Sequence, residues 1–145
     1  MRFLTIKRRK SFVASLGAGH AYIQCDEANS ELEICGYHCK KLGDLKNGGT
    51  LTCEIGEEKT RVFVIYDKAS KDWCNDMYVI EAGSEDVHLS GVAKWGAGNP
   101  FRFDNNPSEE AKALRKKNGR KGSVVMILAF VVGFLLGFFL IPALL

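Results

Sequence analysis

The segment from Cys35 to Cys39 holds the residue types that are best suited to binding a metal ion. It reads Cys-Gly-Tyr-His-Cys, and thiolate and imidazole groups are good zinc ligands. A closed structural site needs four ligands, so Cys53 or Cys74 would have to complete the set from elsewhere in the chain. We therefore expect no metal and no cofactor, and we interpret Gly36-Tyr37 as a turn and the thiols as packing residues.

The three histidines, His20, His38 and His88, are the candidates for a general base. None lies next to a serine or cysteine in a recognisable nucleophile motif, and no paired-acid signature is present. The segment Gly17-Ala18-Gly19 sits between two predicted strands and opens no helix, which a dinucleotide-binding loop requires. The sequence therefore predicts a non-enzymatic protein without catalytic residues.

The stretch Trp95–Phe103 is a glycine-rich loop framed by aromatic residues. Trp95, Phe101, Arg102 and Phe103 could together present a surface for a ligand or a partner peptide. In the alternative interpretation, which we favour, the aromatic rings plug the end of the domain where the chain leaves it.

Basic residues are concentrated at the two ends of an acidic body. Residues 1–10 hold five basic side chains, residues 11–105 hold nine basic and fifteen acidic ones, and residues 106–122 hold six basic and two acidic ones. Lys7-Arg8-Arg9-Lys10 could contact nucleic acid, but no aromatic platform or known reader motif accompanies it. We expect a polar turn between the first two strands there, and no nucleic-acid partner.

The stretch from Val124 to Leu145 contains no charged side chain. As a helix, its 22 residues would span about 33 Å at about 1.5 Å per residue, enough to cross the hydrocarbon core of a bilayer. A core helix of a soluble protein is rarely apolar on every face for so long. We therefore assign residues 123–145 to one transmembrane helix, and we expect a tail-anchored, single-pass membrane protein.

The orientation follows from the residues on either side of the span. Five basic residues precede it: Arg115, Lys116, Lys117, Arg120 and Lys121. Basic residues beside a span stay cytoplasmic, where they would meet the anionic headgroups of the inner leaflet. The five cysteines are irregularly spaced and no secretory signal is apparent, which argues against an extracellular disulfide framework. We expect the N-terminal domain to be cytoplasmic.

Two glycines in the predicted span, Gly133 and Gly137, form a small-xxx-small pair. Such a pair lets two helix backbones approach closely, so a homodimer through the transmembrane helix is one interpretation. The other is that glycine is simply frequent in transmembrane helices.

Residues 106–122 form a basic linker with the signals of a short helix. Asn106 or Ser108 can cap its start, Pro107 suits the first turn, and Gly119 can close it. Only three of its residues, two alanines and one leucine, are apolar, so this helix has little to bury. We expect a juxtamembrane spacer that lies near the headgroups.

Residues 1–105 show short runs of β-branched and aromatic residues broken by turn signals. The predicted strands are Phe3–Ile6, Ser11–Leu16, Ala21–Cys25, Glu31–Cys35, Leu51–Ile55, Arg61–Tyr66, Met77–Glu81, Val87–Leu89 and Phe101–Phe103. The segment Asp67–Asp76 lacks a strand pattern and is predicted to be a loop or a helical turn. Many short strands predict a mainly β domain, a small antiparallel β-sandwich or barrel-like domain.

A compact β-domain without catalytic signatures, joined to a membrane anchor, favours one function over two others. We expect a membrane-tethered interaction or recruitment module whose cytosolic β-domain binds a protein or peptide, on one face or by strand addition. One alternative is a small structural subunit of a larger membrane complex that docks through its transmembrane helix. The other is a β-domain that binds a metal or a small ligand.

Overall fold

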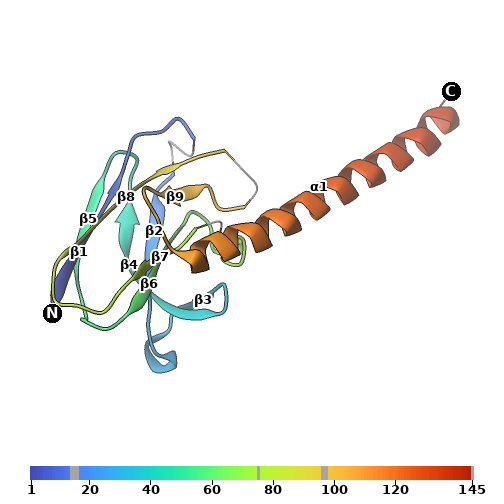
Figure 1. Cartoon of the computed structure of the whole chain (residues 1–145). Helices are drawn as coiled ribbons and strands as arrows, with labels where there is room; N and C mark the ends of the chain where they lie inside the picture. The colour runs from blue at the N-terminus through green and yellow to red at the C-terminus, as the bar shows by residue number, and fades with distance from the viewer. Residues whose placement is uncertain (14–16, 75, 96–97, 145) are drawn as a thin grey trace.

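The computed structural model describes residues 1–13, 17–74, 76–95 and 98–144, and within them the chain is mainly β. Nine strands of these residues form two sheets, and one helix, α1 (Glu109–Leu144), follows them. Figure 1 shows α1 starting against the β-domain and then extending away from it to the C-terminus. The predicted mainly β domain with one C-terminal membrane-length helix is therefore confirmed.

The two sheets differ in size. The four-stranded sheet has the order β5-β1-β8-β9, with β5 (Thr50–Ile55), β1 (Arg2–Arg8), β8 (Val87–Ala93) and β9 (Phe101–Phe103). The five-stranded sheet has the order β3-β4-β2-β6-β7, with β3 (Leu32–Ile34), β4 (Tyr37–Leu45), β2 (Gly19–Gln24), β6 (Thr60–Ile65) and β7 (Tyr78–Ile80). Two short 3₁₀ turns, η1 (Glu27–Asn29) and η2 (Lys68–Ser70), lie between strands.

One hydrophobic core contains side chains from both sheets. Leu4 and Ile6 of β1 come from the four-stranded sheet, and Val62 and Val64 of β6 come from the five-stranded one. Along β1 burial alternates as a two-residue period requires, because Phe3 on the opposite face is 52% exposed. The inner face of each sheet therefore contributes to a shared interior.

A second core lies on the other face of the five-stranded sheet. Phe63 and Ile65 of β6 point into it, so β6 is buried on both faces, as the continuous apolar run Val62–Ile65 predicts. Ala111 of α1 is fully buried in this core, and Leu114 packs against it. The start of α1 therefore covers the outer face of this sheet.

Strand β4 is the longest strand, and the sequence did not indicate it. The pairing of β4 with β2 shifts between Ala21 and Tyr22, which leaves Leu42 as an extra residue in a bulge. A bulge reverses the alternation of side chains, so Cys39 belongs to the second core whereas Leu45 belongs to the first. The sequence of β4 therefore has no single two-residue period to detect.

Three further details differ from the expectations. The pairing of β1 with β8 is parallel, whereas an antiparallel domain was predicted. Residues 11–13 are not in a strand, and the rest of the predicted strand Ser11–Leu16 lies outside the described residues. The predicted short helix and the membrane-length helix are one continuous helix, with Gly119 inside it instead of at its end.

The apolar part of α1 has no protein cover. Among the described residues, α1 is the one helix long and apolar enough to cross a membrane. Its large apolar side chains from Val124 to Leu140 are 45% to 76% exposed. Exposing such a surface to water is strongly unfavourable, whereas lipid accommodates it. These features indicate a single-pass membrane protein.

Candidate functional site

The first turns of α1 dock on the β-domain through one helix face. Ala111, Asn118 and Gly122 are buried, and Leu114 and Arg115 are half-buried between them. This spacing of three, four and seven residues places all five on the same side of the helix. Residues 106–122 therefore pack on the domain, although the sequence predicted a spacer with little to bury.

The buried carboxylate of Asp76 stabilises the junction between the β-domain and the start of α1. Its side chain is fully buried, and it accepts hydrogen bonds from the backbone N–H of Phe103 (2.7 Å) and from the side chain of Asn106 (2.8 Å). The guanidinium of Arg115 donates to it from α1 at 2.9 Å. A buried charge is tolerated only when it is paired and hydrogen-bonded in this way. Asp76 therefore connects β9, the segment before the helix, and α1.

A second ion pair holds the beginning of α1 to β6. Arg61 donates two hydrogen bonds to the carboxylate of Glu110, at 2.8 and 2.9 Å, and its guanidinium lies 4.8 Å from the centre of the Tyr37 ring. The hydrogen bond from Arg61 lowers the pKa of Glu110, and burial only partly opposes this effect. The two ion pairs lie more than one helical turn apart, so together they resist rotation of α1.

Two cysteines meet beneath the same helix. Cys35 and Gly36 form the two-residue turn between β3 and β4, with φ values of 50° and 86°, as in the tight hairpin turns that require positive φ. The thiol of Cys35 donates to the carbonyl oxygen of Lys71 at 3.5 Å. The buried thiol of Cys74 donates to the same oxygen at 3.6 Å. The fold thus brings together two cysteines that lie far apart in the sequence.

The surroundings of Cys35 favour its thiolate form. Its pKa is lowered to about 7, chiefly because the thiol of Cys74 donates a hydrogen bond to it. Burial acts in the opposite direction, while the backbone N–H of Cys74 and the side chain of Asn118 also lower the pKa. Asn118 donates a further hydrogen bond to the carbonyl oxygen of Cys74. One residue of α1 therefore contacts both members of the pair.

The other four cysteines are held as thiols. Burial raises the pKa of Cys39 to about 12, and burial also raises the pKa of Cys25 and Cys53. The pKa of Cys74 lies well above its usual value, because its thiol donates to Cys35 and because it is buried. A thiolate is the nucleophilic form of cysteine, so nucleophilic chemistry near neutral pH is concentrated at Cys35.

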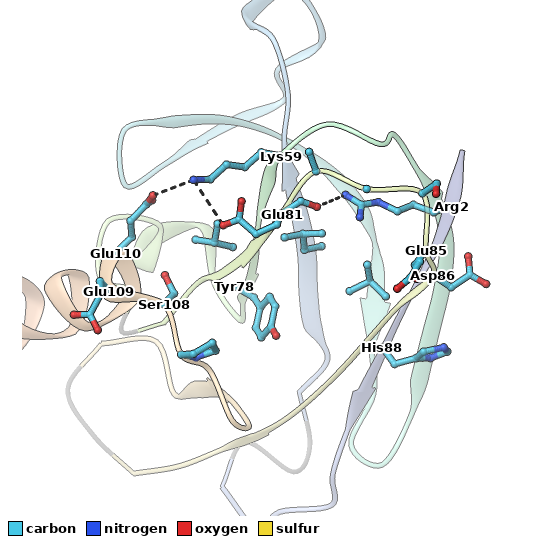
Figure 2. Close-up of a pocket in the computed structure, with 17 residues that line it drawn as sticks. Arg2, Lys59, Tyr78, Glu81, Glu85, Asp86, His88, Ser108, Glu109 and Glu110 are labelled. Atoms are coloured by element: carbon cyan, nitrogen blue, oxygen red, sulfur yellow. Dashed lines mark hydrogen bonds and ion pairs between the residues drawn. The ribbon is translucent and has the colours of Figure 1, made fainter.

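A hollow of about 960 Å³ lies beside the edge strand β7 (Figure 2). Its lining includes five carboxylate side chains, those of Glu81, Glu85, Asp86, Glu109 and Glu110. Two basic residues also line it. Lys59 lies 3.8 Å from Glu81 and 3.9 Å from Glu110, and the nearly buried Arg2 donates to the backbone oxygen of Glu81 at 2.8 Å. The hollow is therefore acidic. It lies beside one edge of the five-stranded sheet, where β7 pairs with β6 on one side and with no described strand on the other.

The structure separates the four residues of the predicted aromatic surface. Phe101 and Phe103 are buried in the first core, with their ring centres 5.0 Å apart. Arg102 is half-buried and donates to the backbone oxygens of Asn99 and Phe101, both at 2.9 Å. Trp95 is 86% exposed and does not join them. Two of the four side chains are thus core residues.

The two predicted basic segments have different environments. In the first, Arg8 is buried and donates to the backbone oxygens of Gly17 and Leu45, and Arg9 binds Asp104 through two hydrogen bonds. In the segment before the membrane span, Arg115 donates a hydrogen bond to Asp76. The other four basic residues of this segment are exposed, namely Lys116, Lys117, Arg120 and Lys121. Four of the five residues of the juxtamembrane cluster therefore face solvent.

The predicted glycine pair lies in the part of α1 that extends away from the domain. Apart from its chain neighbours and the adjacent helix backbone, a Cβ atom placed on Gly133 or Gly137 would meet no heavy atom of the described residues within 4 Å. Among the described residues, no group of three or more histidine, cysteine or acidic side chains is arranged to hold a metal ion.

The sequence matches no protein-family model and no curated protein. The fold defines the class of the protein, a mainly β domain docked on a membrane-length helix. Sequence reasoning missed Asp76, Asn118 and the pairing of Cys35 with Cys74. A buried aspartate in a loop has no sequence signal. The spacing of Ala111, Leu114, Asn118 and Gly122 was a detectable sign of a packed helix face.

Proposed function

We propose that this protein is a membrane-tethered, non-enzymatic interaction module, with its β-domain on the cytoplasmic side as a small sandwich of two sheets. The observation that carries the proposal is the docked junction, in which Asp76 and Glu110 pair with Arg115 and Arg61. A docked junction presents one surface of the β-domain at a constant orientation to the membrane, which lowers the entropy that a recruited partner loses on binding. The four exposed basic residues before the span support the cytoplasmic orientation.

The acidic hollow is the partner surface that we propose, and a basic peptide segment is its occupant. The hollow lies against β7, the last strand of the five-stranded sheet, so an added strand could bond to its backbone. Carboxylates outnumber basic side chains in its lining, and such an imbalance attracts positively charged partners. From Glu109 to Ser123 the helix rises about 21 Å at about 1.5 Å per residue, which would hold the hollow at that height above the bilayer.

A peptide-binding experiment tests this proposal. Full-length protein in lipid nanodiscs is titrated with a fluorescent peptide of alternating valine and lysine, and separately with its glutamate counterpart. We expect the lysine peptide alone to bind, and the double variant E85K/E109K to weaken binding about tenfold or more, with a strong dependence on salt. The double variant E31K/E33K, at two exposed residues outside the hollow, changes the charge by the same amount and should bind as the wild type does. Equal binding of both peptides, or no binding at all, would refute the proposal.

A second candidate function is a subunit that docks through α1. It is favoured by Gly133 and Gly137, which lie one turn apart on a helix face that no described part of the chain covers. In this case the double variant G133L/G137L would abolish a cross-linked dimer or complex in membranes, while peptide binding would persist. Unchanged cross-linking would exclude this candidate.

A further inference from the structure

We propose that Cys35 and Cys74 are a thiol–disulfide exchange site, which a small disulfide such as oxidised glutathione converts to an intramolecular disulfide. Cys35 is the attacking residue and Cys74 is the resolving one. This inference is independent of the proposed partner and of the acidic hollow, because it involves the opposite end of the contact between the domain and α1.

The geometry places the two sulfur atoms close together. The sulfur atoms of Cys35 and Cys74 lie 3.5 and 3.6 Å from the same atom, the carbonyl oxygen of Lys71. When Cys35 is a thiolate, the Cys74 thiol donates its one proton to that sulfur in place of the Lys71 oxygen. Cys35 is held by a tight turn, while Cys74 lies in the segment between η2 and β7. A hydrogen-bonded pair of thiols needs only a small movement to reach the bond length of a disulfide, about 2.05 Å.

The reaction balances in two steps. The Cys35 thiolate attacks one sulfur of the small disulfide, whose S–S bond breaks and releases one small thiolate. The thiol of Cys74 then attacks the Cys35 sulfur of this mixed disulfide. Its proton passes to the second small thiolate as that group leaves. Two protein thiols are oxidised to one disulfide, and one small disulfide is reduced to two thiols.

The environment assigns the two roles. Cys35 is half-buried, so a small disulfide can approach it, and it receives hydrogen bonds from the backbone of Cys74 and from Asn118. The pKa of Cys35, lowered to about 7, makes its thiolate more available at neutral pH than that of an ordinary cysteine, and an attacking thiol with a pKa near the ambient pH is best suited to exchange. Cys74 is fully buried and protonated, so it reacts only with a sulfur already inside the site.

The position of the pair gives the reaction a structural consequence. Asn118 of α1 donates to the backbone oxygen of Cys74 and lowers the pKa of Cys35. Only two residues after Cys74, Asp76 binds Arg115 of the same helix. Oxidation removes the negative charge of the Cys35 thiolate, which Asn118 helps to stabilise. The redox state of the pair therefore alters the contact that sets the angle between the β-domain and its membrane helix.

Disulfide mapping of the wild-type protein tests the proposal without any substitution. Full-length protein in nanodiscs is equilibrated at pH 7 with reduced and oxidised glutathione in varied ratios, and free thiols are then alkylated. We expect mass spectrometry to find one internal disulfide, between Cys35 and Cys74, with the other three cysteines alkylated. A disulfide between any other pair, or five alkylated thiols at every ratio, would overturn the proposal.

Single variants separate the two roles. C74S should accumulate a mixed disulfide with glutathione at Cys35, because the resolving thiol is missing, and C35S should form neither product. C53S is the matched control and should give the wild-type disulfide. The alkylation rate of Cys35 should rise with pH around a midpoint near 7, and N118A should raise that midpoint and slow alkylation at pH 7 about fivefold. A midpoint near 9 in the wild-type protein would contradict the assignment of Cys35 as the attacking residue.

Discussion

Replacing Asp76 with asparagine should loosen the whole junction between the β-domain and α1. Its Oδ1 atom accepts from Asn106, from Arg115 and from the backbone of Met77, and its Oδ2 atom accepts from the backbone of Phe103. An asparagine offers one acceptor oxygen. In either orientation of the asparagine amide, its NH₂ group would point at a hydrogen-bond donor that the carboxylate of Asp76 accepts from.

The expected cost follows from burial and from the exposure of the partner. Removing one member of a buried ion pair costs about 3–5 kcal/mol, because the remaining charge is left without compensation. The side chain of Arg115 is 39% exposed, so water partly replaces the lost carboxylate. We therefore expect D76N to lower the free energy of unfolding by about 2–3 kcal/mol, below the range for a fully buried pair.

Denaturant unfolding of the full-length protein in micelles, followed by the β signal in circular dichroism, measures this cost. The control is D72N, an identical change at an exposed aspartate of the same segment, which should alter stability by no more than about 0.5 kcal/mol. In a double-mutant cycle, D76N and R115Q should be strongly coupled, since both act on one ion pair. A cost for D76N as small as that of D72N would show that Asp76 does not fasten the helix.

Three further predictions concern Glu110 at the beginning of α1, the turn that carries Cys35, and Gly119 inside α1. E110Q should cost about 0.5–1 kcal/mol at pH 7, a modest value because Glu110 is 39% exposed. Arg61 lowers the pKa of Glu110 in the folded protein below its value in the unfolded chain, which is about 4.3. The ion pair therefore contributes its full stability at pH values above the unfolded-state pKa. That contribution is lost as the pH falls through the lower, folded-state pKa. Unfolding curves of E110Q and the wild type should therefore differ at pH 7 and converge once the pH has fallen below the lowered pKa of Glu110; a constant difference would contradict this. G36A should destabilise the protein by about 1 kcal/mol, because φ at Gly36 is +86°, whereas G119A inside α1 should stabilise it by a similar amount. The same unfolding assay measures both, and equal signs would refute the turn assignment.

The strands with a regular pattern were predictable from the sequence, and the irregular ones were not. Phe3–Ile6 and Arg61–Tyr66 correspond to β1 and β6, because alternating or continuous apolar runs have a single interpretation in a sheet. Strand β4 was missed because its bulge at Leu42 sends residues of the same parity to opposite faces. Sequence periodicity cannot show where a bulge lies before the partner strand is known.

The candidate site depends even more on tertiary structure. The membrane-length helix is a local property of composition, so it could be predicted. By contrast, the meeting of Cys35 with Cys74 depends on a turn and a loop that are 39 positions apart in the printed sequence. Similarly, the basic residues near Arg115 looked equivalent in sequence, and only the burial of Asp76 distinguishes Arg115 from its neighbours.

The distance between the β-domain and α1 gives the most direct test of a docked junction. Spin labels introduced as non-canonical amino acids at Ala28 and Lys121, both exposed, avoid the native cysteines, and electron–electron double resonance in nanodiscs measures their separation. A fixed domain predicts one narrow distance distribution, which D76N should broaden. A broad distribution in the wild-type protein, typical of a flexible linker, would contradict the account.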